Sequence, residues 1–195
     1  MQYKKEFIRK LIHISSLWIP VLYLYTTTAV MLKILFPLVI GALLIEIIRK
    51  RSSKLNSFII TLIGSIMRDE EKNSRSFAGA THLFMSSTLT IAFFNKDIAI
   101  FALFILIISD TFAALVGQKF PIIRIGSKSL VGSLSFAISS YFIYYYLLNY
   151  HYFDLPFFQS MIAILFATLI ELFAKRIKID DNFLIPFAVG MIMVW

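Results

Sequence analysis

An acidic residue lies inside an apolar run in the middle of the chain, and small residues follow it. The stretch 109–133 reads SDTFAALVGQKFPIIRIGSKSLVGS, and Asp110 is its carboxylate. A carboxylate within a membrane-spanning segment is costly, so it indicates a functional site by default. One interpretation is a Mg²⁺ ligand, because this ion is usually held by one or two carboxylates together with substrate phosphates. The alternative is a structural ion pair with a Lys or Arg of another segment.

The residues after Asp110 are of the types that a phosphate site uses. Backbone N–H groups of glycines at a helix N-terminus, hydroxyls and a point positive charge all favour anions. The candidates for phosphate contacts are Gly117, Lys128, Ser129, Gly132 and Ser133. The GxxxxGK[ST] pattern of a Walker loop is absent. The alternative is a basic turn with a Ser or Gly helix cap.

A second group of polar residues opens the chain. Glu6, Arg9, Lys10 and His13 have the spacing i, i+3, i+4 and i+7, which is one face of a helix. Arg9 and Lys10 could bind a phosphate, and His13 could relay a proton because its ordinary pKa is near neutrality. A basic membrane anchor with a structural histidine explains the same pattern equally well.

Further acids fall at comparable depth in other apolar runs. Glu46, Asp110 and Glu171 each lie just inside the end of a predicted span, which suggests one polar cavity. A helical ion pair with Lys175 is the alternative for Glu171. Asp181 and Asn182 follow as metal or nucleotide ligands, with an acidic helix N-cap at 180–182 as the alternative.

Composition identifies the elements that must position these residues. The chain has 195 residues, 59% of them hydrophobic and 15% charged, with a mean hydropathy of +0.82. Soluble domains carry about 25% charged residues, so we predict an all-α integral membrane protein of one domain. The absence of cysteine excludes disulfide and thiolate chemistry. The net charge of +8 does not indicate a nucleic-acid partner, because the basic residues flank apolar runs.

Seven apolar runs approach the length of about 20 residues that a bilayer requires. The predicted spans are 11–25, 29–48, 77–94, 98–117, 131–148, 157–174 and 183–195. Segment 55–67 is shorter and is predicted to be an interfacial helix. Loops rich and poor in Lys and Arg alternate, so the positive-inside rule places the N-terminus in the cytoplasm and the C-terminus on the far side.

These motifs, in this order and spacing, resemble the CTP-dependent lipid kinases, namely dolichol kinase, phytol kinase and CTP-dependent diacylglycerol kinase. The matching features are Arg9-Lys10-x-x-His13, Glu46 with Arg49, Arg68 to Glu71, Gly79-Ala80-Thr81, Asp110-Thr111-x-Ala113-Ala114-x-x-Gly117, Lys128-Ser129-x-x-Gly132-Ser133, and Glu171 with Asp181-Asn182. The chain departs from the family pattern at Ser109, Pro121 and Val131, where the family usually has Gly, Gly and Glu. The resemblance implies transfer of a phosphoryl group from CTP to a lipid hydroxyl with a divalent metal. The family is also similar to the phosphatidate cytidylyltransferases.

The resulting hypothesis is a CTP-dependent kinase of a polyprenol, dolichol-like or related isoprenoid alcohol in a bacterial inner membrane. Asp110, Asp181 and Glu171 would hold Mg²⁺; Lys128 would stabilise the transferring phosphoryl group; and Glu71 or His13 would accept the proton. The predicted nucleotide and phosphate ligands are Arg9, Lys10, Arg68, Gly117, Ser129, Gly132, Ser133 and Asn182. The alternatives are a cytidylyltransferase and a transporter or assembly factor without chemistry. The sequence leaves the lipid alcohol and a homo-oligomeric state open.

Overall fold

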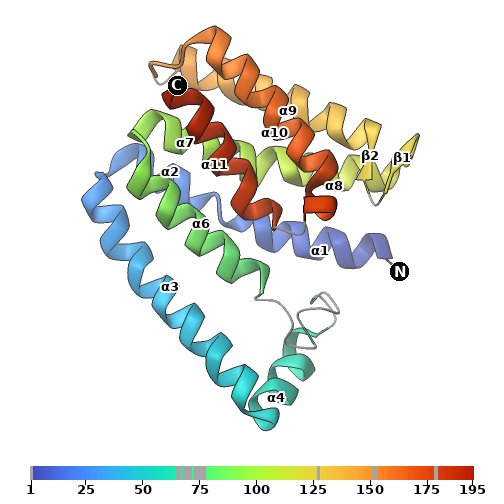
Figure 1. Ribbon diagram of the computed structural model, residues 1–195. Coiled ribbons are helices and arrows are strands. Elements are labelled where there is room, and N and C mark those ends of the chain that lie inside the picture. Colours follow the sequence, from blue (N-terminus) through green and yellow to red (C-terminus); the bar gives the residue numbers. More distant parts are fainter. Residues whose placement is uncertain are drawn as a thin grey trace.

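The computed structural model describes residues 2–64, 67, 72, 78–126, 128–150, 153–177 and 180–195, and this part of the chain is almost entirely helical (Figure 1). The elements are α1 (Gln2–Ser15), α2 (Trp18–Tyr25), α3 (Thr28–Arg51), α4 (Ser53–Ile63), α6 (Gly79–Phe93), α7 (Lys96–Phe104), η1 (Ile105–Ser109), α8 (Asp110–Lys119), β1 (Arg124–Ile125), β2 (Lys128–Ser129), α9 (Leu130–Tyr150), α10 (Phe157–Ile177) and α11 (Asp181–Val194). Two candidate site residues, Arg68 and Glu71, lie outside the described residues.

Four segments of the described chain are long and apolar enough to cross a membrane. They are Lys5–Tyr25, Thr28–Arg51, Lys96–Lys119 and Leu130–Tyr150. Two shorter apolar helices, Phe157–Phe173 and Asp181–Val194, add to them. The protein is therefore an all-α integral membrane protein. The seven-span topology and the sidedness of the termini remain predictions.

The first predicted span is divided into two helices. α1 ends at Ser15 and α2 begins at Trp18, with Ser16 N donating to His13 O at 3.0 Å in the turn between them. Pro20 has no N–H to donate to the carbonyl four residues earlier. The chain therefore starts a new helix that carries the proline in its first turn, where proline is tolerated.

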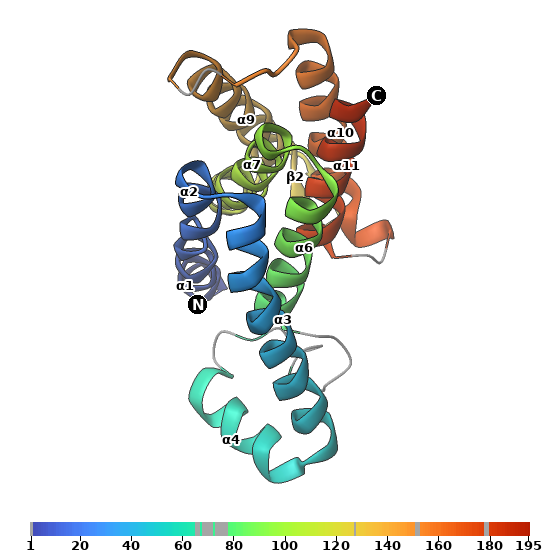
Figure 2. The same cartoon turned by 90° about the vertical axis from the view of Figure 1, so that its left-hand side faces the viewer.

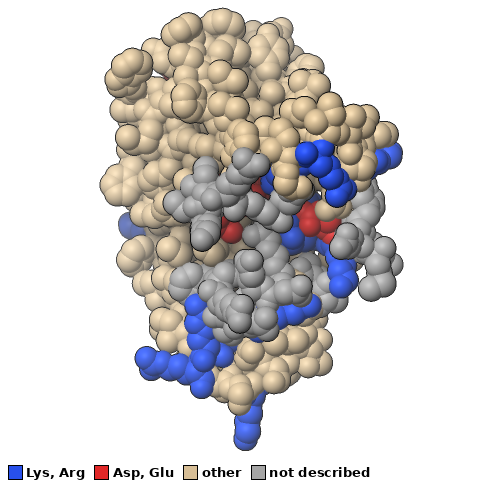
Figure 3. Space-filling model, turned by 45° about the vertical axis from the view of Figure 1, so that its right-hand side comes forward, with Lys and Arg blue, Asp and Glu red and all other residues tan. Residues whose placement is uncertain are grey.

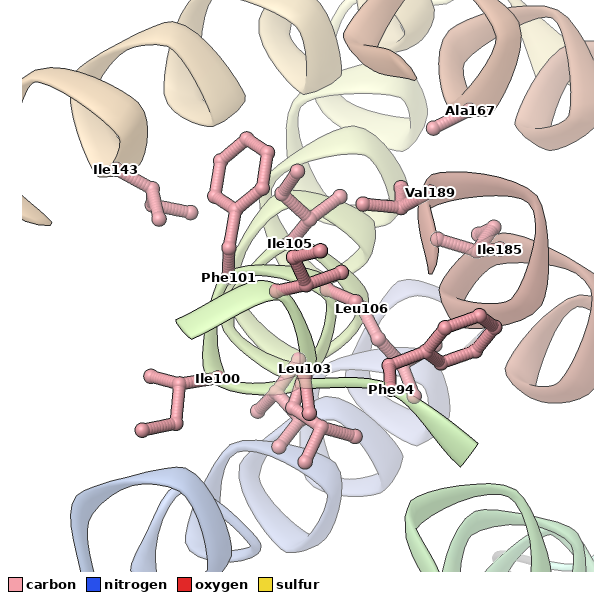
Figure 4. Close-up of a cluster of buried hydrophobic side chains, with 14 of the residues drawn as sticks. Phe94, Ile100, Phe101, Leu103, Ile105, Leu106, Ile143, Ala167, Ile185 and Val189 are labelled. Carbon is pink, nitrogen blue, oxygen red and sulfur yellow. The ribbon is translucent and has the colours of Figure 1, made fainter. Parts of the chain in front are cut away.

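The helix formed by α7, η1 and α8 is the centre of the fold. In Figure 4, Ile143 of α9, Ala167 of α10 and Ile185 and Val189 of α11 lie around its buried side chains. Nine of its residues are fully buried, namely Ala99, Ile100, Phe101, Ala102, Leu103, Ile105, Leu106, Ile107 and Ser109. A helix that is apolar on every side belongs inside a bundle, and this one holds its neighbours in register around it.

A π-helical turn, η1, lies directly before Asp110. Such a turn widens the helix by one residue, so every side chain after it points in a different direction from that expected for a regular α-helix. Two contacts support the turn: Thr111 Oγ1 donates to Ile107 O at 2.7 Å, and Ser140 Oγ donates to Ser109 Oγ at 2.9 Å. Asp110 therefore has an orientation that the helical period of the sequence does not predict.

A short antiparallel ribbon joins α8 to α9. Arg124 pairs with Ser129 and Ile125 with Lys128, and Gly126 turns the chain with a φ of +64°. This ribbon fixes Lys128 at the start of α9, next to the end of α8. It is the one strand pairing in the described chain, and we did not predict it.

The helix α3 extends beyond the rest of the bundle and carries α4 at its end (Figures 1 and 2). Ser52 caps α4 by accepting from Leu55 N at 3.3 Å. The predicted interfacial segment 55–67 thus begins two residues earlier, as a helix over Ser53–Ile63.

Candidate functional site

Charged side chains from α1, α8, β2, α10 and α11 form two contact groups, which interact through the charges of Asp110 and Lys128. We call Lys10, Asp110, Lys128, Glu171 and Asp181 the charged network. Lys10 Nζ donates to Asp110 Oδ2, joining α1 to α8, and His13 Nε2 lies 3.7 Å from the same oxygen. Asp110 is only 2% exposed. The buried acid thus faces two basic side chains of α1 at the i and i+3 positions.

Lys128 is surrounded by acids. Its Nζ donates to Glu171 Oε1 at 2.6 Å and lies 3.6 Å from Asp181 Oδ2. Burial alone would lower the pKa of Lys128, but Asp110, Asp181 and Glu171 together raise it well above the ordinary value. Lys128 therefore carries a full positive charge at physiological pH and cannot serve as a proton donor there.

Glu171 is committed to two protein partners. Lys128 donates to one of its oxygens, and Ser133 Oγ donates to the other, Oε2, at 2.8 Å. Its side chain is 1% exposed. The alternative pairing with Lys175 concerns a side chain outside the described part. In this geometry Glu171 holds Lys128 in place, and it could bind a metal only after losing one of these partners.

Asp110 retains one unused acceptor. Its Oδ1 is buried and has no hydrogen-bond partner among the described residues, an arrangement that ordinarily costs about 1–3 kcal/mol. Within the same residues, no cluster of three or more His, Cys, Asp or Glu side chains could hold a metal alone. Mg²⁺ needs only one or two carboxylates when phosphates complete its shell. The unpartnered oxygen of Asp110, together with Asp181, which lies 3.6 Å from Lys128 Nζ, is the type of donor set that such a shared site uses.

The two glycines predicted to contact phosphates lie where α8 and α9 meet. A Cβ on Gly132 would lie 2.7 Å from Ala113 O, and one on Gly117 would lie 3.2 Å from Gly132 Cα. Ser129 Oγ donates to Gly117 O and accepts from Gly132 N at 3.1 Å, as a helix cap does. These residues bring Lys128 close to the acids, and direct phosphate binding by them remains a prediction.

The remaining candidates have partners of their own. Arg9 donates to Glu6 at 2.6 Å on the same helix. Asn182 donates through its backbone N and its side chain to Asp180, which is the N-cap of α11. The acidic-cap interpretation therefore applies to Asp180, while Asp181 is left to face Lys128.

Among the described residues, Glu46 forms its contacts apart from the charged network, although we expected one cavity for three carboxylates. It accepts from Arg49 of its own helix at 2.7 Å and from Ala78 N at 3.0 Å. In Figure 3 the charged side chains gather in the lower part of the face shown, below a large uncharged surface. The charges thus share one end of the protein but form at least two separate groups.

Two features of the site lacked any signal in the sequence. The π-helical turn occurs in ILIIS, a run that is equally compatible with a regular helix. The bond from Lys128 to Glu171 depends on the ribbon between α8 and α9. The pairing of Lys10 with Asp110, by contrast, was open to prediction as the ion-pair alternative for Asp110.

The whole chain has a relative of similar length among known proteins. The chain is 32% identical over 181 residues to the uncharacterized protein RP860 of Rickettsia prowazekii, covering 92% of this chain and 89% of that protein. The chain belongs to the same family as RP860. No protein-family model and no solved structure matches it.

Two further relatives have a named activity. Both are called CTP-dependent diacylglycerol kinase 1, from Saccharomyces cerevisiae and Eremothecium gossypii, and are 30% and 32% identical over 138 residues. The match covers 68% of this chain, but only 47% and 43% of those proteins, so the chain spans less than half their length. This distant homology supports a place among the CTP-dependent lipid kinases.

Proposed function

We propose that the protein transfers the γ-phosphoryl group of CTP to the hydroxyl of a membrane lipid. The observation that carries the proposal is the charged network itself, in which lysines and carboxylates from α1, α8, the ribbon, α10 and α11 meet at one end of a membrane bundle. The homology to CTP-dependent diacylglycerol kinases supports the donor and the class of acceptor.

The lysines supply the positive charge that phosphoryl transfer requires. This reaction depends on positioning and on stabilising the charge of the transferring oxygens. Glu171 and Asp181 hold the ammonium group of Lys128, and in the proposed complex this group would contact the γ-phosphate. Lys10 and Arg9, on the facing helix, would contact the other phosphates, with Arg68 and Asn182 as further nucleotide ligands.

Asp110 and Asp181 would hold Mg²⁺, with Glu171 as a ligand only if Lys128 moves away. The metal would neutralise charge on the phosphates when bound. Asp110 Oδ1 is the oxygen available for this role, because Oδ2 already accepts from Lys10. Asp110 thus orients Lys10 with one oxygen and has the other free for a ligand.

In the proposed reaction the lipid oxygen forms a bond to the γ-phosphorus while the bond from that phosphorus to the β–γ bridging oxygen breaks. CDP leaves, and the lipid hydroxyl loses its proton to a base. His13 and Glu71 are the candidates for this base. His13 lies within 3.3 Å of Leu106 O and next to Asp110, so it is the candidate that belongs to the described site.

The acceptor is an alcohol that lies among the helices with its hydroxyl at the charged end. The sequence led us to a polyprenol or a related isoprenoid, whereas the names of the relatives favour diacylglycerol. We propose that the chain crosses a bacterial inner membrane with the charged end in the cytoplasm, where CTP is available. The seven-span topology predicted above is part of this proposal.

Labelled nucleotide distinguishes the possible reactions. Purified protein in nanodiscs is incubated with CTP labelled in the γ- or the α-phosphate, with diacylglycerol or a polyprenol, and with or without Mg²⁺. A kinase transfers only the γ label to lipid; a cytidylyltransferase given phosphatidate transfers the α label. Asp154→Asn, at an exposed acid outside the charged network, serves as the matched control for Asp110→Asn. Absence of label in every lipid would overturn the proposal.

A further inference from the structure

The helix α4 starts at the point where a membrane-spanning helix ends. The apolar segment of α3 runs over Thr28–Arg51, and Ser52 both ends α3 and caps α4. Figure 2 shows α4 at the tip of α3, beyond the other described helices. A helix that follows a span within one residue lies close to the boundary between hydrocarbon and headgroups.

The exposed face of α4 has an apolar edge and a polar edge. Phe58 and Leu62, one turn apart, are 60% and 64% exposed. Ser57 and Thr61 are also exposed and lie beside them on the polar edge. This division is typical of a helix that lies in the plane of a membrane interface with one edge in the acyl region and the other in water.

Two exposed basic residues accompany the apolar edge. Arg51 ends α3, and Lys54 lies one turn before Phe58 on the same side of α4. Neither forms an ion pair with any residue that the structure describes. Long basic side chains in this position reach the headgroup level while their stems cover apolar surface. Their charge is complementary to anionic lipids, which attract juxtamembrane Lys and Arg.

We propose that α4, with Arg51 and Lys54, is a docking surface for anionic phospholipid headgroups in the leaflet that contains the charged end of the protein. Phe58 and Leu62 enter the acyl region, and the two basic side chains bind the phosphates above them. The position of α4 at the end of a span favours lipid over a protein partner. This surface is separate from the charged network and does not depend on the kinase proposal.

The chain contains no cysteine, so single cysteines can report the depth of each position. Phe58→Cys, Leu62→Cys, Ser57→Cys and Thr61→Cys each receive a nitroxide label in the full-length protein, reconstituted in phosphatidylcholine vesicles with or without phosphatidylglycerol. Oxygen, which concentrates in lipid, should reach the labels at 58 and 62 preferentially. A water-soluble nickel chelate should preferentially reach those at 57 and 61.

The charge component is tested on the Leu62→Cys background. Phosphatidylglycerol should move the label deeper, and Arg51→Gln with Lys54→Gln should abolish that shift, whereas Lys33→Gln at the other end of α3 should preserve it. Equal access of nickel to all four labels would overturn the proposal. Low access of both reagents at 58 and 62 would indicate a protein cover and overturn it too. If the depth of the label were the same with and without phosphatidylglycerol, the anionic headgroup would be excluded as the ligand.

Discussion

Two buried ion pairs in this protein have similar composition, but their carboxylates differ in whether the second oxygen has a hydrogen-bond partner. Asp110 pairs with Lys10 across 100 residues of sequence, and its second oxygen has no partner in the described chain. Glu46 pairs with Arg49 three residues away, and its second oxygen accepts from Ala78 N. Both carboxylates are nearly inaccessible to solvent. Among the described residues, only the Asp110 carboxylate of these two has an oxygen without a partner, whereas the unpartnered atom of the second pair is a donor, Arg49 Nε.

This difference distinguishes a site from a structural contact. A buried ion pair by itself is weak evidence for function, because breaking any such pair is costly. Glu46 joins the end of α3 to the start of α6, which is a complete structural role. Asp110 joins α1 to α8, and its charge also helps to raise the pKa of Lys128, which is held by acids from two further helices.

The largest contrast is expected between Asp110→Asn and Glu46→Gln. Loss of the Asp110 charge should lower the rate of phosphoryl transfer about 10²–10³-fold, comparable to the loss of a major charge-stabilising group. Glu46→Gln should leave the rate within a few-fold but cost about 3–5 kcal/mol of stability, because Arg49 loses its buried partner. Initial rates and thermal unfolding in detergent measure the two effects. Equal loss of activity in two folded variants would remove the distinction.

Lys128 should be the second most sensitive position. Lys128→Met removes the charge held between Glu171 and Asp181, and we expect about a 10²-fold loss in kcat. Lys128→Arg should recover part of it, since Arg keeps the charge but changes its geometry. Lys33→Met, at the far end of α3, is the control and should behave like the wild type. Indistinguishable kcat values for Lys128→Met and the control would argue against a role in transfer.

Glu171→Gln should change the pH dependence of the reaction. The carboxylate helps to raise the pKa of Lys128, so its neutralisation lowers that pKa. Activity that depends on the Lys128 ammonium should then decline at a lower alkaline pH in the variant than in the wild type. Profiles of kcat against pH, with Asp154→Asn as the control, provide the measurement. A metal-ligand role for Glu171 alone would lower activity and raise the Mg²⁺ requirement without moving the alkaline limb.

The smallest effects concern the glycines between α8 and α9. Gly132→Ala should destabilise the protein by about 1–3 kcal/mol, because the new methyl group would meet the Ala113 carbonyl. Gly41→Ala, where nothing lies within 4 Å, should be neutral or stabilising by up to about 1 kcal/mol. If Gly132→Ala weakened CTP binding without altering thermal unfolding, the phosphate-binding interpretation would hold instead.

Helix positions were predictable because they depend on local apolar runs. The predicted span 131–148 lies within α9, and 98–117 lies within the helix from Lys96 to Lys119. The break between α1 and α2 was harder to predict from the sequence, although Pro20 was a signal for it. The turn η1 was not predictable, since nothing in ILIIS favours a π-helix over an α-helix.

The site was only partly predictable for a related reason. Sequence spacing identified residues of the right type, and the structure brings Lys10, Asp110, Lys128, Glu171 and Asp181 together. Sequence spacing could not identify which acid pairs with which base. Glu171 was predicted to be a metal ligand, with Lys175 as the alternative partner, and neither prediction indicated the bonds that it accepts from Lys128 and Ser133. These bonds form because the ribbon between α8 and α9 places Lys128 beside α10. Glu46 and Asp110 were predicted to lie at similar depth in their spans, but their side chains contact different groups of residues.

Binding of labelled CTP, measured by equilibrium dialysis in the presence of Mg²⁺, tests the central claim most directly. If the charged network is a triphosphate site, the wild type and Glu46→Gln should bind CTP with equal affinity, and Lys128→Met should bind at least about tenfold more weakly. Equal binding by all three folded proteins, or no binding by any of them, would contradict the account.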